Sequence, residues 1–352
     1  MIDKNTFTIE WIKEVSAKNR NADKLLVEKV CRAFILLEVL SESGLDFIFK
    51  GGTALMLLTD SRKRLSIDID IIVPNHIELN ELLEKTASQK GFVNIEKHNR
   101  KKRDVIDKTH YKFFYVPAYR TALETDYILL DILFEEPKYK NIRRSKIESP
   151  FLKTTGEPVE VHVPGFEDIL GDKLTAYAPN TTGIPYKKGN NSTTMEICKQ
   201  LYDIGTLFDQ IDNIVIVRST FMEFAETEAK YRDIEITPND VLEDIYQTSL
   251  CITTRGQDGN GDFEAILAGI KRVRTYIFSE SYHLERAIRD AAKAAYLSTL
   301  IKSGRDNFER YKNAEQIKEM IIDQPFNTKL NKLRKTDPES FFYWYHTCSL
   351  LK

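Results

Sequence analysis

Hydrophobic and polar positions follow two different periods in the first half of this chain. Apolar residues at helical spacing predict helices at residues 7–18, 22–43 and 78–90, with another beginning at Thr53. Runs of aromatic and β-branched residues predict strands just before Gly51, up to Pro74, and at 110–116, 127–134 and 156–163. This half of the chain therefore predicts a mixed β-sheet flanked by helices.

The pattern changes after Pro164, where the helical period takes over. Predicted helices follow at 165–177, 194–209, 214–228, 238–253, 262–279, 283–303, 309–322 and 336–350. A loop rich in proline and glycine separates the first two. We therefore expect an α+β protein of two domains, with the mixed sheet in residues 1–164 and a helical domain in residues 165–352.

Composition narrows the class of protein. The chain has 352 residues, enough for a sizeable core, and its charges nearly cancel to a formal net charge of -2. Net charge alone therefore does not indicate a nucleic-acid binder. The four cysteines lack the C-x-x-C spacing of zinc sites and fit a reducing compartment. Without a leader-like apolar region or an apolar run of membrane-spanning length, the sequence predicts a soluble cytoplasmic protein.

The most informative segment is residues 47–74, FIFKGGTALMLLTDSRKRLSIDIDIIVP. It predicts a strand, a Gly-Gly-Thr turn at 51–53, a helix, and a second strand with Asp68 and Asp70. Because residues i and i+2 of a strand share a face, both carboxylates project to one side. Such a pair is costly unless a cation lies between them, and Mg²⁺ or Mn²⁺ suits carboxylates combined with substrate phosphates. The alternative is an edge strand with solvated carboxylates, which the apolar residues 71–73 disfavour.

The order of these motifs resembles a known family. The matching residues are Gly51-Gly52-Thr53-Ala54-Leu55 followed by Arg64-x-Ser66-x-Asp68-x-Asp70. This order resembles the AbiEii/AbiGii toxins, MenT-like nucleotidyltransferases of type IV-like toxin–antitoxin and phage-defence systems. The resemblance covers most of residues 45–210, and it implies a nucleotidyltransferase-like fold in residues 1–164 with an NTP as donor.

The resemblance also implies roles for the residues of this segment. Asp68 and Asp70 would bind Mg²⁺ against the triphosphate. The glycines let the backbone approach a phosphate, and the helix that follows supplies N–H donors, so Gly51, Gly52 and Thr53 would contact the donor.

Two residues that precede the aspartates are further candidates. Ser66 falls on the strand face of the two acids, where its hydroxyl would bind a phosphate or a metal-bound water. Arg64 would either bind a phosphate or pair with an acid and hold the turn. The sequence leaves both roles of Arg64 open.

Asp131 lies in the apolar run Leu129–Leu133, and a charge in such a strand needs a partner. Nucleotidyltransferase sheets commonly place a third carboxylate on the strand beside the aspartate pair. There it completes the metal site or acts as a base on the attacking hydroxyl. The resemblance therefore implies a catalytic role for Asp131, with Asp126 as a nearby competitor. The alternative is a structural carboxylate paired with a Lys or Arg.

Two helical motifs extend the resemblance. Lys173, in Lys-Leu-x-Ala, matches the second motif of the family and would neutralise the donor triphosphate. Asp203 matches the third motif and would orient Lys173 or the nucleotide. Lys199 shares a helix face with Asp203, whereas Gln200 stands near where the family more often has an acid. The alternatives are a solvated lysine and an ordinary surface ion pair.

Basic residues are concentrated in runs at 97–103 and 138–146. Because they lie beside a predicted phosphate-binding site, we interpret them as a surface that binds a nucleic-acid backbone. The alternative is an ordinary solvent-exposed charged face. The loop 178–189, which includes Tyr186, Lys187 and Lys188, is placed to be a lid or a substrate contact, with a plain connector as the alternative.

Together these features predict a metal-dependent nucleotidyltransferase toxin. By analogy with the family, it would add a nucleoside monophosphate to the 3′ end of tRNA, and its partner would be a winged-helix antitoxin. Two alternatives stay open: transfer to a small molecule or a protein side chain, as in AMPylation, and a nucleotide- or RNA-binding module without turnover. A glycosyltransferase with a DxD motif would leave the Gly-Gly-Thr turn unexplained.

Overall fold

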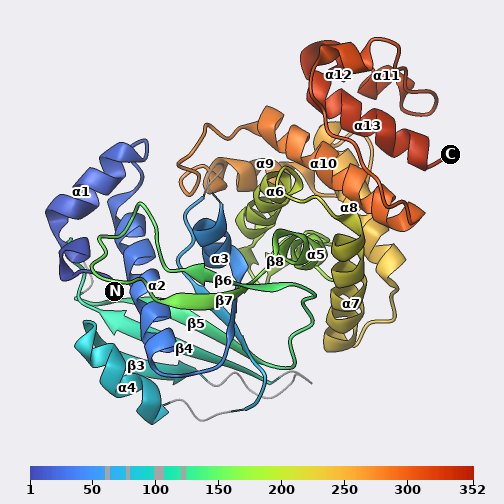
Figure 1. The fold of residues 1–352 in the computed structure, drawn as a ribbon. Coiled ribbons are helices and arrows are strands. Elements are labelled where there is room, and N and C mark those ends of the chain that lie inside the picture. The colour runs from blue at the N-terminus through green and yellow to red at the C-terminus, as the bar shows by residue number, and fades with distance from the viewer. Residues whose placement is uncertain (60–63, 77–79, 99–106, 120–123) are drawn as a thin grey trace. The chain divides into compact units, whose positions relative to one another are not determined.

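The computed structural model describes residues 1–59, 64–76, 80–98, 107–119 and 124–352 (Figure 1). The chain divides into two compact units. Unit 1 comprises Met1–Gly165 and Thr275–Ser281, and unit 2 comprises Phe166–Arg274 and Tyr282–Lys352. The predicted fold class, a mixed sheet with flanking helices followed by a helical part, is confirmed. No helix in the described part of the chain is long and apolar enough to cross a membrane.

Unit 1 contains a seven-stranded mixed sheet of order β3-β4-β5-β2-β1-β7-β6. Its strands are β1 (Ile48–Lys50), β2 (Ile69–Val73), β3 (Phe92–His98), β4 (Lys108–Tyr115), β5 (Asp126–Phe134), β6 (Ile142–Lys146) and β7 (Glu160–Pro164). β2 pairs antiparallel with β1 and parallel with β5, so the edge-strand alternative for β2 is wrong. β6, which the sequence marked only as a basic run, is instead an edge strand of this sheet.

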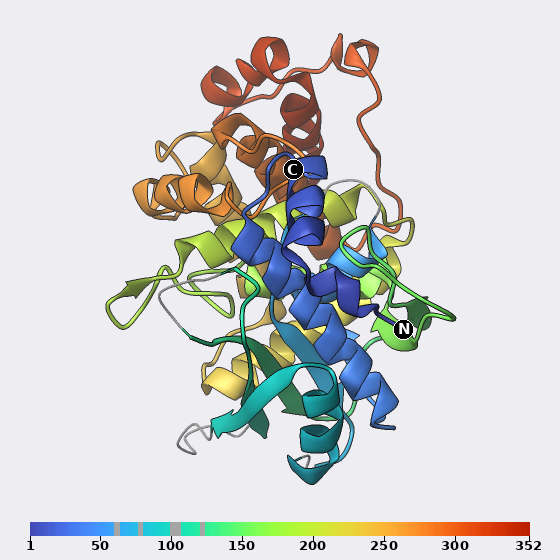
Figure 2. The ribbon, with the colours of Figure 1, turned by 90° about the vertical axis from the view of Figure 1, so that its left-hand side faces the viewer.

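Helices cover one face of this sheet. Those of unit 1 are α1 (Ile9–Lys18), α2 (Lys24–Glu42), α3 (Gly51–Leu58) and α4 (Asn80–Gln89), after a 3₁₀ turn at Lys4–Phe7. α2 and α4 lie on the same side of the sheet (Figures 1 and 2) and share its hydrophobic core. In β4, Tyr111 and Phe113 are buried in this core, whereas His110 and Lys112 are only partly buried. Since strand side chains alternate, the opposite face of the sheet retains the polar residues.

Unit 2 is helical. Its helices are α5 (Phe166–Ala176), α6 (Thr194–Phe208), α7 (Ile214–Arg232), α8 (Pro238–Thr253), α9 (Phe263–Val273), α10 (Leu284–Ser303), α11 (Asn327–Leu330), α12 (Leu333–Thr336) and α13 (Pro338–Leu350). A short hairpin of β8 (Lys187–Lys188) and β9 (Asn191–Ser192) precedes α6. The predicted strands and most predicted helices are therefore present, with two exceptions.

Both exceptions arise where long-range contacts replace helical hydrogen bonds. The helix predicted at 262–279 ends at Val273, because the next residues join unit 1, where the Leu65 N–H donates to the Tyr276 carbonyl at 2.7 Å. The helix predicted at 309–322 contains only a 3₁₀ turn, Ala314–Ile317. There the Arg310 guanidinium donates to backbone carbonyls, that of Phe208 at 3.2 Å among them.

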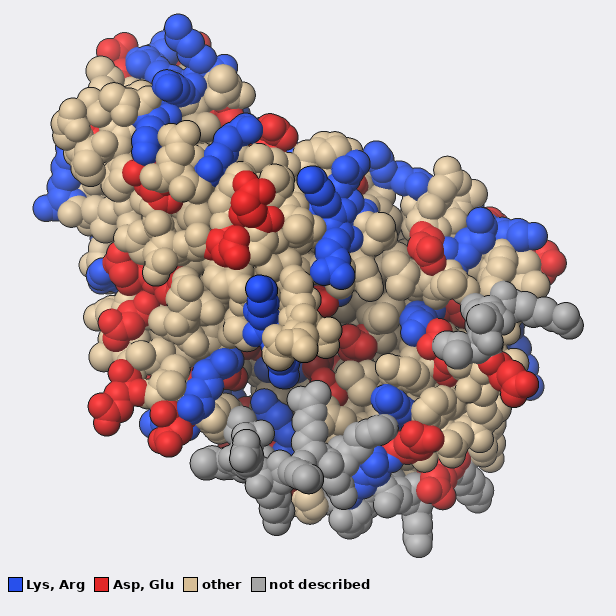
Figure 3. Space-filling view, turned by 180° about the vertical axis from the view of Figure 1, so that it is seen from behind, with Lys and Arg blue, Asp and Glu red and all other residues tan. Residues whose placement is uncertain are grey.

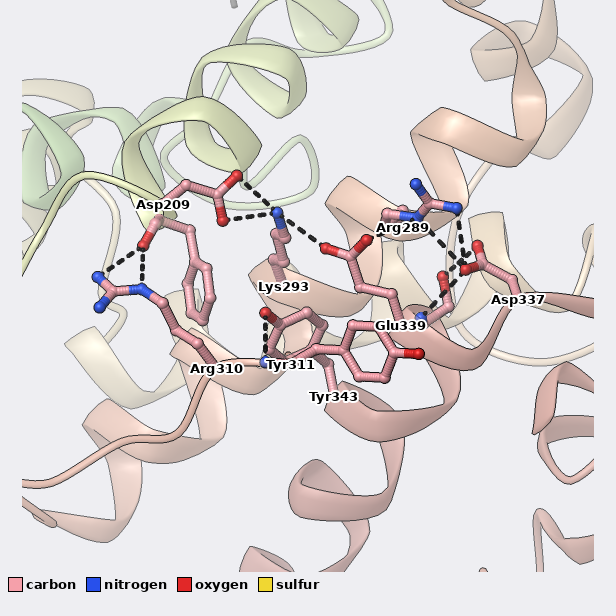
Figure 4. A network of polar contacts seen from close by, with 10 residues as sticks. Asp209, Arg289, Lys293, Arg310, Tyr311, Asp337, Glu339 and Tyr343 are labelled. Atoms are coloured by element: carbon pink, nitrogen blue, oxygen red, sulfur yellow. Dashed lines mark hydrogen bonds and ion pairs between the residues drawn. The ribbon is translucent and has the colours of Figure 1, made fainter. Parts of the chain in front are cut away.

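Charged side chains connect three elements of unit 2 (Figure 4). On α10, the Lys293 ammonium lies 2.8 Å from both carboxylate oxygens of Asp209 and 3.2 Å from Glu339. Arg289, one turn earlier, lies 3.1 Å from Asp337 and 3.1 Å from Glu339. The Lys293 side chain is only 4% exposed. We refer to these five residues as the α13 network, because they hold the first turn of α13 to α10 and to the end of α6.

Candidate active site

The Gly-Gly turn joins β1 directly to α3, which begins at Gly51. Gly51 has a φ of +82°, a backbone conformation that L side chains rarely adopt. A Cβ at Gly51 would also overlap the Asp70 carboxylate, and one at Gly52 would lie 2.5 Å from an Arg64 nitrogen and 2.7 Å from Ser66 Oγ. The N-cap residue, Lys50, makes no side-chain capping bond, and the first N–H groups of an α-helix have no acceptor within the helix. The turn therefore places the first backbone N–H groups of α3 close to these three side chains.

The two aspartates lie at the start of β2. The strand begins at Ile69, so Asp68 is one residue ahead of the strand that was predicted to contain it. Ile69 is fully buried, whereas Asp68 is exposed and Asp70 is partly exposed. Both carboxylates thus project away from the core. The Thr53 hydroxyl donates to the Asp68 carbonyl oxygen at 2.6 Å. That bond fixes α3 to the aspartate segment.

Arg64 and Ser66 lie where the chain approaches β2. Arg64 is 7% exposed, and its guanidinium donates to the Leu65 carbonyl at 3.2 Å. The backbone of Arg64 also forms an antiparallel β-bridge with Ile277. Ile277 lies between α9 and α10, in the segment Thr275–Ser281 that belongs to unit 1. The Ser66 N–H donates to Met56 Sδ at 3.3 Å. Both roles predicted for Arg64, binding a phosphate and holding the turn, stay predictions.

Four polar residues lie side by side in neighbouring strands. Lys50 of β1 pairs with Asp70 of β2, Asp70 with Asp131 of β5, and Asp131 with His110 of β4. Because residues at paired positions point to the same face, all four share the sheet face opposite the helices of unit 1. We refer to them as the sheet row. In the described part of the chain, no three His, Cys, Asp or Glu side chains form a metal-binding group, so Asp131 does not join Asp68 and Asp70 in one.

The partner of Asp131 is a histidine, not the Lys or Arg considered from the sequence. His110 Nδ1 lies 2.5 Å from Asp131 Oδ1. Sequence analysis missed His110, since only the register of β4 against β5 brings it to Asp131. Asp126, the competing acid, pairs instead with Lys29 of α2 at 2.8 Å and lies outside the sheet row.

In unit 2, Lys173 and Asp203 form a buried ion pair. The Lys173 ammonium lies 2.8 Å from Asp203 Oδ2, with the side chains 8% and 1% exposed. It also donates to Gln200 Oε1 at 3.0 Å, a contact that the sequence did not predict. Lys199 pairs with Glu196 on its own helix at 2.9 Å. Lys173 is therefore not a solvated surface lysine, and α6 fixes the position of its ammonium.

The helix that carries Lys173 is itself firmly held within unit 2. The Thr220 hydroxyl of α7 donates to the fully buried Asp168 at 2.6 Å. Gly171 lies so close to α7 that a Cβ would be 2.9 Å from the Phe221 backbone nitrogen. The absence of a side chain at Gly171 lets α5 and α7 pack closely, and the hydrogen bond to Asp168 holds them together.

The loop between α5 and α6 is tied down at its base and exposed at its tip. Buried Asp244 of α8 accepts hydrogen bonds from the Asn180 N–H at 2.8 Å and from the Thr181 hydroxyl at 2.9 Å. Lys187 and Lys188 are exposed on the hairpin. The base is thus part of the helical core, while the tip presents two cations.

The second basic run forms an exposed edge. Arg143, Arg144 and Lys146 of β6 are exposed. Residues 99–103 of the first run lie outside the described residues. On the face shown in Figure 3, basic side chains form separate groups among acidic ones, in keeping with the near-zero net charge. On this face, positive charge is therefore divided among separate groups.

Comparison with known proteins settles the family. A family model described as nucleotidyl transferase AbiEii toxin, type IV toxin–antitoxin system, matches residues 35–272, more than half of the chain. The chain belongs to this family. It is a nucleotidyltransferase of the AbiEii toxin family, as the resemblance of its motifs predicted, and membership implies an NTP substrate and a cognate antitoxin.

Two solved structures are similar to this AbiEii-family chain at low identity. MenT4, a nucleotidyltransferase toxin from Mycobacterium tuberculosis, is 14% identical with a TM-score of 0.41, over 81% of this chain and 88% of that one. An antigenic nucleotidyltransferase-like protein from Paracoccidioides brasiliensis is 14% identical with a TM-score of 0.35, over 61% and 96%. No curated protein matches the chain. Structural similarities at this level of identity do not identify the functional residues of this chain.

Proposed function

We propose that this enzyme transfers a nucleoside monophosphate from an NTP to the 3′ end of a tRNA in the cytoplasm, as the toxin of a toxin–antitoxin or phage-defence system. The carrying observation is the contact of the α3 N-terminus with Asp70. A triphosphate bound to the backbone N–H groups of residues 51–53 would lie directly beside the carboxylates of Asp68 and Asp70.

The donor set fits a hard divalent cation. Asp68 and Asp70 offer oxygen ligands away from the core, one exposed and one partly exposed. Mg²⁺ typically takes one or two carboxylates together with phosphate oxygens and waters, and Mn²⁺ accepts the same ligands. When bound there, the ion would neutralise charge on the triphosphate and favour attack at the α-phosphate.

The protein itself would bind and orient the donor. Gly51 and Gly52 leave room for the phosphates, and Ser66 would add a hydroxyl donor beside them. Lys173 would supply a cation to the phosphates as charge develops on the leaving pyrophosphate. Of its three N–H groups, two are bound by Asp203 and Gln200 in the described part of the chain, which leaves one to donate.

Exposed cations support RNA as the acceptor. The edge strand β6 presents Arg143, Arg144 and Lys146 to solvent, and the β8–β9 hairpin presents Lys187 and Lys188, charges that suit a phosphate backbone. A winged-helix antitoxin would act on the toxin or its product.

The test is incubation of the purified protein with each α-³²P-labelled NTP, Mg²⁺ and total tRNA, followed by a denaturing gel. Asp70→Ala is the inactive comparison, and Asp126→Asn is the matched control, because Asp126 is an acid of the same sheet that pairs with Lys29. We expect label in tRNA from the parent and from Asp126→Asn only. Label in protein or in small solutes would instead support AMPylation or a small-molecule acceptor. NTP binding without any label would support a binding module.

A further inference from the structure

The contact between His110 and Asp131 points to a role for a residue that no sequence motif contains. His110 Nδ1 lies 2.5 Å from Asp131 Oδ1, and the side chains are 14% and 34% exposed. Both are thus sheltered but reachable. The pair is formed by direct cross-strand neighbours of β4 and β5, so the sheet itself fixes its geometry.

The position of Asp131 makes such a partner necessary. On one side it adjoins Asp70 in the register of β2 and β5. Its nearest neighbours on its own strand face, Leu129 and Leu133, offer no hydrogen bond. Two adjacent carboxylates repel each other, so a hydrogen bond is needed to hold Asp131 in one orientation beside Asp70. His110 supplies that bond from the side of Asp131 opposite to Asp70.

The bond also selects which carboxylate oxygen is available. In this contact a protonated Nδ1 of His110 would donate to the carboxylate oxygen Oδ1. With Oδ1 occupied by His110, Oδ2 is the oxygen left for another group. A second hydrogen-bonding partner that fixes the orientation of a functional side chain is a common feature of active sites.

We propose that His110 is a positioning residue that orients Asp131, with Oδ2 toward the acceptor hydroxyl. This rests on the nucleotidyl transfer proposed above. The hydroxyl oxygen forms its new bond to the α-phosphorus and the bond to pyrophosphate breaks. The hydroxyl proton passes to Asp131 Oδ2 and from there to water. His110 keeps its own proton throughout.

A spectroscopic test does not depend on activity. Protein labelled with ¹⁵N-histidine is examined by long-range ¹H–¹⁵N correlation, and the His110 signal is assigned among the six histidines by its loss in His110→Asn. We expect a proton on Nδ1 of His110 in the parent at neutral pH, and loss of that preference in Asp131→Ala. An unprotonated Nδ1 in the parent, or the same spectrum in Asp131→Ala, would overturn the proposal.

A kinetic test separates positioning from general support of the fold. His110→Ala should lower kcat about 10- to 100-fold, the usual cost of losing such a partner, while KM for NTP stays within about twofold. His110→Asn, whose amide can replace the Nδ1 donor, should recover most of the rate. In the Asp131→Ala background, His110→Ala should cost nothing further.

The chain offers a matched control for this test. His76 and Asp107 form a second His–Asp pair in unit 1, at 2.8 Å and about half exposed, outside the sheet row. His76→Ala should leave kcat unchanged. Equal losses for His110→Ala with and without Asp131, or a change confined to KM, would refute the positioning role. If the parent transfers no label at all, nucleotidyl transfer to tRNA fails, and the histidine spectrum still decides whether the His110–Asp131 bond exists.

Discussion

The sheet row of unit 1 and the α13 network of unit 2 are built from similar charged residues but differ in how these are balanced. In the network, Lys293 and Arg289 alternate with Asp209, Asp337 and Glu339, and each carboxylate has a cation within 3.2 Å. In the sheet row, by contrast, two carboxylates are direct neighbours, with Lys50 on one side and His110 on the other.

This difference concerns like and opposite charges. A buried set of charges is tolerable when its members satisfy one another, and it then fixes the elements that carry them. Neighbouring acids on one face of a sheet repel each other, and a bound cation would relieve that repulsion. The α13 network therefore has the electrostatic character of a structural site, whereas the sheet row has the character expected of the proposed ligand site.

The largest effect that would sharpen this comparison is expected at the aspartates. Asp70→Ala and Asp68→Ala should each lower nucleotidyl transfer at least about 1,000-fold, equivalent to about 4 kcal/mol of transition-state stabilisation. Toxicity on expression should disappear with it. Both variants should remain folded, because neither carboxylate belongs to the hydrophobic core of unit 1. Full toxicity of both variants would show that the aspartates do not carry the chemistry.

Sequence analysis identified the part of the site that is local in the chain. Gly51, Gly52, Asp68 and Asp70 lie within 20 residues, so a short strand–turn–helix–strand pattern was enough to predict their proximity. Asp131 was also anticipated, because an isolated charge in an apolar strand is conspicuous.

What the sequence did not reveal depends on contacts between distant segments. His110 meets Asp131 only through the register of two antiparallel strands, and registers leave no signature in composition. Gln200 reaches Lys173 across two helices. The helix predicted at 309–322 fails for the same reason, since its periodicity is helical but Arg310 instead binds carbonyls at the end of α6. Tertiary contacts override local propensity in each case.

The next largest effect should appear in the α13 network, as stability without loss of chemistry. Lys293→Met leaves Asp209 and Glu339 without their shared cation, and we expect it to lower the free energy of unfolding by about 2–4 kcal/mol. Urea titration measures this, and transfer per folded molecule should be unchanged. Lys302→Met on the same helix is the control, since its pair with Glu243 is over 40% exposed on both sides and should contribute less than about 1 kcal/mol. Equal losses in the two variants would mean that burial of the network does not matter.

A smaller effect, which combines both properties, is expected at the glycine turn. Gly51→Ala forces a methyl group onto the Asp70 carboxylate and strains a positive φ, so we expect a loss of about 1–2 kcal/mol in stability and at least tenfold in transfer. Gly156→Ala is the matched control, since Gly156 also has a positive φ, +69°, but no atom lies within 4 Å of the added Cβ. It should share the loss of stability and retain activity. Inactivity of Gly156→Ala would show that backbone strain, not contact with Asp70, decides the result.

The smallest effect is a pH dependence that belongs to unit 2 alone. Burial lowers the pKa of His346 on α13, against a smaller upward influence of Glu309. Its Nε2 is buried without a hydrogen-bond partner in the described part of the chain, and its ring lies 4.4 Å from that of Phe342. Since the folded pKa lies below the unfolded value of 6.5, the unfolded state takes up more protons as the pH falls through that value. Acid should therefore destabilise the parent through this group, whereas above about pH 7.5 the group is neutral in both states and contributes no pH dependence.

His346→Phe keeps an aromatic ring in place and removes the titration. In urea titrations, the difference in unfolding free energy between parent and variant should be constant above neutrality and should shift in favour of the variant below it. Parallel curves across the whole range would show that His346 is protonated as easily in the folded protein as in the unfolded chain, and that acid acts on this enzyme through other groups.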